Sequence, residues 1–153
     1  MKHGKILLLM VVLSCFIGAS GLFALDKNTL AGSVYDSSWG PVYLAVDADG
    51  EWVFVYTYSD SGRTRYGIMD GEMSLASKEK VRTFELVWRE FDPDFTKGAE
   101  GTVTLVFQGS LTFAGTWYNA SGQPGGEWNG TFKREMTKED LTLVEKILEA
   151  TGY

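Results

Sequence analysis

The sequence predicts an all-β fold: an antiparallel, up-and-down meander β-barrel of about eight strands, with a C-terminal α-helix packed outside it. Three observations support this prediction. Apolar and polar residues alternate with a period of two along most of the chain, as in strands that line a core with one face. The 153 residues include 18 glycines, 3 prolines and 14% aromatic residues, which suits many strands joined by glycine turns. The period becomes helical only near the C-terminal end.

The clearest segment is 101–119, which predicts two strands around a tight turn at residues 108–110. Alternate side chains point to opposite faces of a strand, so each strand has one apolar face for a core. The apolar residues of the two faces are Val103, Leu105, Phe107, Leu111, Phe113 and Trp117.

Similar but shorter patterns lie upstream. Strand signals begin at residues 33–35 and continue through 39–46, and further strands are predicted at 51–59, 65–69, 72–77 and 81–90. Asp70-Gly71 predicts a two-residue hairpin turn between two of them. Polar or acidic segments predict turns or loops at 47–50, 59–64 and 77–80, and the longest loop at 91–100.

The C-terminal part ends in a helix. A glycine-rich loop at 120–126 precedes the last predicted strand, 127–134. Thr137 is a good N-cap and Gly152 a good stop signal, so a helix is predicted over residues 137–150. Its apolar stripe, which needs the outside of the sheet as a surface, consists of Leu141, Val144, Ile147 and Leu148.

A barrel is favoured over a two-layer β-sandwich, which is the alternative. Closing a meander removes its unpaired edges. Glycines at positions 67, 71, 115 and 130 fall in or beside strands, where strong bending is expected. An eight-stranded barrel has room for packed side chains or for one small ligand.

Residues 1–24 predict a signal peptide. Lys2 and Lys5 form a basic start, and the apolar run 6–17 leads to small residues and Ala24. Cleavage there would leave residues 25–153 as one exported domain, periplasmic or secreted, with no transmembrane span. The alternative to a signal peptide is a buried N-terminal helix.

A lipoprotein is the alternative form of export. Residues 12–15, VLSC, resemble a relaxed bacterial lipobox, which would place a lipid anchor on Cys15 and hold the protein at the cell envelope.

Removal of this segment restricts the chemistry. The only histidine is His3 and the only cysteine is Cys15. The mature chain would therefore lack the groups needed for Ser-His-Asp or Cys-His catalysis and for histidine-bound zinc or haem. Loss of Lys2 and Lys5 leaves 14 − 2 = 12 basic against 20 acidic residues, a net charge near −8. That charge argues against nucleic acid and anionic lipid as partners. We expect a protein that is not an enzyme and has no cofactor.

Carboxylates leave two weaker hypotheses open. Glu85 and Glu90 lie at odd separation and so on opposite faces of one strand, but either could pair with a carboxylate of a neighbouring strand, as in a glycan hydrolase. The candidates for such a pair are Asp70, Glu72 and Glu127. Asp47, Asp49 and Glu51 could hold calcium, although turn chemistry alone explains them, and no metal site is predicted.

Aromatic residues are the strongest functional candidates, since aromatic faces line pockets for apolar ligands. The predicted ligand-binding residues are Trp52, Tyr56, Trp88, Phe107, Phe113, Trp117 and Trp128. The alternative for each is that it fills the barrel as core.

The chain resembles the small barrels of the lipocalin and avidin superfamily. Trp39 enters an early strand, Arg134 closes the last strand, residues 115–119 read GTWYN, and a C-terminal helix follows. The resemblance implies that Arg134 packs on Trp39 and that the barrel binds a small apolar ligand.

The predicted function is therefore a non-catalytic exported binding protein for a small apolar or aromatic ligand. The alternative is an envelope interaction protein, in which a filled barrel presents Tyr56, Tyr58 and Tyr118 to a protein or glycan partner.

Overall fold

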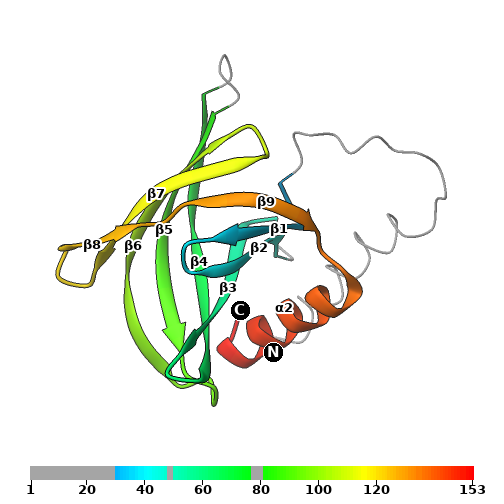
Figure 1. Cartoon of the computed structure of the whole chain (residues 1–153), viewed down its shortest axis with the longest axis vertical. Coiled ribbons are helices and arrows are strands. Elements are labelled where there is room, and N and C mark those ends of the chain that lie inside the picture. The colour runs from blue at the N-terminus through cyan, green and yellow to red at the C-terminus, as the bar shows by residue number, and fades with distance from the viewer. Residues whose placement is uncertain (1–29, 48–49, 77–80) are drawn as a thin grey trace.

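The computed structural model describes residues 30–47, 50–76 and 81–153, which form nine strands and one helix (Figure 1). The strands are β1 Ser33–Ser37, β2 Gly40–Val46, β3 Trp52–Asp60, β4 Arg63–Ala76, β5 Val81–Phe91, β6 Lys97–Gln108, β7 Thr112–Asn119, β8 Pro124–Glu127 and β9 Gly130–Glu135. The helix α2 spans Lys138–Thr151. The predicted signal peptide and the predicted turn at 77–80 lie outside the described residues.

The strands close into an antiparallel barrel, as predicted. β1 to β7 pair in sequence order, and β9 pairs with β1 on one side and with β7 on the other. The ring therefore contains eight strands. β8 pairs only with the second half of β7. β9 pairs only with the first two residues of β7, Thr112 and Phe113. Regular strand pairing is therefore interrupted at Trp128 and Asn129, between β8 and β9, and this interruption is the break in the barrel wall. Single backbone hydrogen bonds still cross it, from Trp128 N to Gly115 O and from Ser38 N to Asn129 O.

Three turn or loop predictions and one core position were wrong. Leu111, predicted on the apolar face of a strand, is 62% exposed and lies in the turn before β7. Asp70-Gly71 is not a turn, because β4 runs through it and pairs continuously with β5. A side chain at position 71 would place its Cβ 2.1 Å from the Glu85 carbonyl oxygen, so glycine permits this close approach. The predicted loop 91–100 is shorter, since β6 already begins at Lys97. The predicted loop 120–126 contains most of β8.

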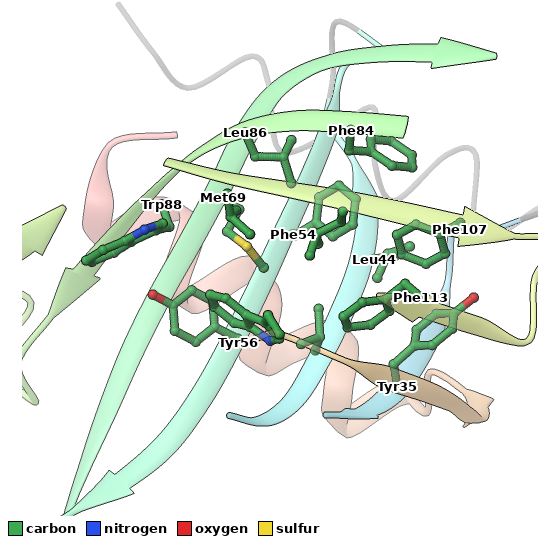
Figure 2. Packing of buried hydrophobic residues seen from close by; sticks show 14 of the residues in the cluster. Tyr35, Leu44, Phe54, Tyr56, Met69, Phe84, Leu86, Trp88, Phe107 and Phe113 are labelled. Atoms are coloured by element: carbon green, nitrogen blue, oxygen red, sulfur yellow. The ribbon is translucent and has the colours of Figure 1, made fainter. Parts of the chain in front are cut away.

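The barrel is packed solid at one end. Aromatic rings from several strands meet there at centroid distances of 5.0–5.6 Å, including Phe84, Phe107, Phe113 and Tyr35 (Figure 2). The Tyr35 hydroxyl, which is fully buried, donates a 2.7 Å hydrogen bond to the carbonyl oxygen of Ser110 in the β6–β7 turn. This bond and the buried Leu30 close that end.

The helix lies outside the ring, as predicted (Figure 1). Val144, Ile147 and Leu148 are buried against the outward-facing residues of β1 to β5, whereas Leu141 is only half-buried. Thr137 and Asp140 form the N-terminal capping box, and Gly152 ends the helix in the left-handed conformation. No helix within residues 30–47, 50–76 and 81–153 is long and apolar enough to cross a membrane.

Arg134 and Trp39 do not make the contact that the resemblance implies. Arg134 pairs with Val34 near the start of β1, whereas Trp39 follows the other end of β1. Arg134 instead forms a bidentate ion pair with Asp140 and so ties the helix N-terminus to the barrel.

Candidate ligand-binding cavity

Side chains do not completely fill the end of the barrel opposite the packed end. A cavity of about 280 Å³ lies there, between the ends of β3, β5, β6 and β7 and the break in the wall. Its lining residues are Trp39, Tyr56, Trp88, Glu90, Ala99, Trp117, Asn119 and Trp128. Four of the five tryptophans of the chain therefore surround one small space.

Hydrogen bonds fix three of the four indole rings. Trp88 Nε1 donates to the carbonyl oxygens of Thr102 (3.2 Å) and Tyr118 (3.1 Å). Trp128 Nε1 donates to Ser37 Oγ at 3.1 Å. Trp39 is 38% exposed, at the turn between β1 and β2.

Trp39 also spans the break in the wall. Its Nε1 donates a 3.2 Å hydrogen bond to the carbonyl oxygen of Glu127 at the end of β8. This side chain therefore connects the turn to a strand that has no second strand neighbour among the described residues.

The rings stand nearly at right angles. Trp117 meets Trp39 and Trp88, each at a centroid distance of 5.6 Å, with interplanar angles of 88° and 86°. Tyr56 meets Trp128 at 4.8 Å and 90°. Edge-to-face pairs are a favourable aromatic geometry, and here they turn ring faces in several directions around the cavity.

Two buried polar atoms of the lining lack a hydrogen-bond partner among the described residues: the Tyr56 hydroxyl and Trp117 Nε1. The Tyr56 side chain is only 1% exposed. Leaving a buried donor unpaired costs about 1–3 kcal/mol, and such exceptions are uncommon in native proteins. Both residues line the cavity, the Tyr56 hydroxyl over Gly67 of β4 and the Trp117 indole over Gly125 of β8, so a ligand could satisfy either donor.

Glu90 is the carboxylate of the lining. Burial raises its pKa above the usual range, while a hydrogen bond from Tyr58 and the charge of Arg65 act in the opposite direction. Burial likewise raises the pKa of Tyr56 well above its ordinary value, and the charge of Glu90 adds to that effect. The cavity wall thus carries one partly buried carboxylate and no basic side chain.

Glycines make the space that two of the aromatic rings occupy. A Cβ at Gly67 of β4 would lie 1.9 Å from Cζ of Tyr56. A Cβ at Gly125 of β8 would lie 2.1 Å from Cη2 of Trp117. Larger residues at these positions would force the rings to move.

The structure divides the seven predicted ligand-binding residues into two groups. Tyr56, Trp88, Trp117 and Trp128 line the cavity. The others belong to the packed core: Phe107 and Phe113 are buried within it, and Trp52 packs beside it on Phe84.

Sequence reasoning did not place Trp39, Glu90, Ala99 and Asn119 in the site. Glu90 carried a usable signal, because it lies two residues after Trp88 and so shares its face of β5. Strand periodicity could not place Trp39 in the site, because Trp39 lies in the turn between β1 and β2 and not in the predicted strand 39–46.

The carboxylate hypotheses gain no support from these positions. Glu85 is exposed on the outer face of β5, opposite Glu72 of β4, and Asp70 binds Arg89 at 2.6 Å. Among the residues that line the cavity, Glu90 is the only carboxylate. Within the described part of the chain, no group of three or more His, Cys, Asp or Glu residues could hold a metal ion.

A shallower groove of about 670 Å³ lies beside the cavity and shares Trp39 with it. Its other lining residues include Pro41, Thr57, Tyr58 and Asp60. The groove could accommodate a part of a ligand that extends past Trp39.

Comparisons of the chain with protein-family models, with curated proteins and with solved structures each found no match.

Proposed function

We propose that the protein is a non-catalytic binding barrel, which holds a small apolar or aromatic ligand in the cavity at its open end. The observation that carries the proposal is the convergence of four tryptophans and two unpaired donors on one 280 Å³ space. Ligand pockets have this composition: mostly apolar and aromatic walls with a few polar groups that orient the ligand.

The size of the cavity narrows the ligand class. Pockets for drug-sized ligands measure about 300–1,000 Å³, so this one is at the small end. A tetrapyrrole or a long fatty acid would not be enclosed. A single-ring compound or a short branched chain fits better.

Matched tryptophan variants test this proposal. Trp117 lines the cavity, whereas Trp52 packs on Phe84 at the other end. Small aromatic and apolar compounds should change tryptophan emission, and calorimetry should give their affinities. Trp117→Phe should weaken binding, as should Trp88→Ala, by roughly 1–3 kcal/mol if the ring touches the ligand. Trp52→Phe should leave the affinity unchanged.

A screen in which no small compound altered the emission of the wild-type protein would remove the support for a binding barrel. Equal loss of affinity in the Trp117 and Trp52 variants would show that the ligand binds elsewhere.

A surface role is the second candidate, and a different observation favours it. Beyond Asp70, β4 no longer pairs with β3, so residues 71–76 form a strand edge without a β3 partner. Met73 and Leu75 are 38% and 53% exposed there. Such edges can accept a strand from another protein. Tyr56 cannot contribute to such a surface, because it is buried inside the barrel.

A further inference from the structure

Building on the proposed function, we propose that the cavity binds a compact organic cation: a trimethylammonium group with an oxygen on its fourth substituent, held by the tryptophan faces and the Glu90 carboxylate. Three features of the cavity point to this chemistry: its charge, the nature of its walls and the position of its free donors.

The charge of the cavity favours a cation. Glu90 is the only carboxylate in the lining, and the lining contains no lysine or arginine. A neutral ligand would remove the remaining water from this carboxylate without compensating its charge, which is costly. A cation placed beside Glu90 supplies that compensation.

The charged groups near Glu90 do not compensate its negative charge fully. Arg65 lowers the pKa of Glu90, but its Nη2 lies 3.5 Å from Asp60 Oδ2 and so serves a second carboxylate. Tyr58 donates a hydrogen bond to Glu90 and carries no charge at neutral pH, since burial raises its pKa to about 12. Arg65, the cation that acts on Glu90, is thus shared with Asp60, and Glu90 has no cation of its own within the cavity lining.

The walls suit a cation without N–H groups. Tryptophan is the best aromatic partner for a cation, and quaternary ammonium ions are the ligands for which aromatic walls are best suited. The near-perpendicular arrangement of Trp39, Trp88 and Trp117 allows more than one ring to act on the same methyl groups. A primary ammonium would need hydrogen-bond acceptors that these walls do not provide.

The unpaired donors account for the oxygen. The Tyr56 hydroxyl and Trp117 Nε1 are buried and have no partner among the described residues. A hydroxyl or carboxylate oxygen on a short arm of the cation could accept a hydrogen bond from one of them. Choline is the simplest probe that combines both features.

Choline and its uncharged isostere 3,3-dimethylbutan-1-ol form the decisive pair of probes, because they differ only in the replacement of nitrogen by carbon. Calorimetry and tryptophan emission at constant ionic strength give both affinities. Choline should bind roughly tenfold more tightly, as expected for a desolvated cation–π contact. Tetramethylammonium, which lacks the oxygen, should bind more weakly than choline.

Glu90→Gln should abolish the preference for choline: it should weaken choline binding and tighten binding of the alcohol, which no longer has to desolvate a carboxylate. Glu85→Gln is the matched control, because Glu85 lies on the same strand but on its exposed outer face. This control should retain the preference. A thermal melt of each variant verifies that the barrel remains folded.

Equal affinity for the two probes, or a preference that survives Glu90→Gln, would overturn the cation proposal and leave the binding barrel intact. The same holds if neither probe binds while a neutral aromatic compound does. If no compound of either kind binds, both proposals fail.

Discussion

The unpaired hydroxyl of Tyr56 leads to a prediction about stability whose sign is unusual. Tyr56→Phe removes one oxygen atom from a side chain that is 1% exposed and has no hydrogen-bond partner among the described residues. Since a buried unpaired donor costs about 1–3 kcal/mol, the variant should be more stable than the wild type, by about 1 kcal/mol at the lower limit. In a domain of this size such a gain raises Tm by roughly 3–5 °C.

Tyr35→Phe provides the matched control. Tyr35 is equally buried, at the packed end of the same core, but its hydroxyl donates a 2.7 Å hydrogen bond to Ser110 O. The same chemical change should therefore lower the free energy of unfolding by about 1 kcal/mol. Because the apolar terms of the two substitutions are alike, the difference between the variants isolates the hydrogen bond.

The measurement is the urea unfolding midpoint and Tm of the wild type and the two variants, without ligand. If Tyr56→Phe raises the free energy of unfolding and Tyr35→Phe lowers it, the Tyr56 hydroxyl is unpaired in the folded protein. If Tyr56→Phe destabilises the protein as much as Tyr35→Phe does, the Tyr56 hydroxyl has a partner, and the argument from free donors fails.

Three further predictions concern charge, the helix and export. Burial raises the pKa of Glu90 in the folded state, so the folded protein binds more protons than the unfolded chain and loses stability as pH rises through that range. Glu90→Gln should therefore raise Tm at pH 7 and raise it little below pH ~4, which is near the pKa of glutamate in the unfolded chain. An equal gain in Tm at both pH values would refute this prediction. Val144→Asp, at a fully buried helix position, should cost about 3 kcal/mol, whereas Thr142→Asp on the exposed face should cost almost nothing; unchanged melting of the first would mean that the helix is not docked. N-terminal sequencing should find a mature chain that starts near residue 25, or an acylated Cys15, and retention of Met1 would contradict export.

Local signals in the sequence were sufficient for the barrel and its helix. The period of two identified the inward faces of β5 and β6, and the caps Thr137 and Gly152 set the helix to within one residue at either end. The local signals failed where pairing with a neighbouring strand decides the conformation. Asp70-Gly71 is a turn signal by itself, yet eleven consecutive pairs between β4 and β5 hold it in a strand. Pro124 and Gly125 are poor strand formers, yet β8 forms along β7 because small residues leave room for the Trp117 ring.

The candidate site was half predictable for a geometric reason. Trp52, Phe54, Tyr56 and Tyr58 alternate along β3, so periodicity assigns all of them to the same face. Periodicity does not determine how far along the barrel axis each side chain lies, which is its height in the barrel. The first two lie in or beside the packed end, whereas Tyr56 reaches the cavity. Height depends on how eight strands are staggered around the ring, which is a property of the whole fold.

The division of the interior into a packed end and an end with a cavity also explains how the cavity could bind tightly without being large. Three of its indoles are already fixed by hydrogen bonds to Thr102, Ser37 and Glu127, so a ligand would not bear the cost of ordering them. Trp117 lacks such a bond and has the donor that a ligand could use. Affinity should therefore respond most to Trp117 and Glu90, while changes in the packed end, such as Phe107→Leu, should lower stability and leave affinity largely intact.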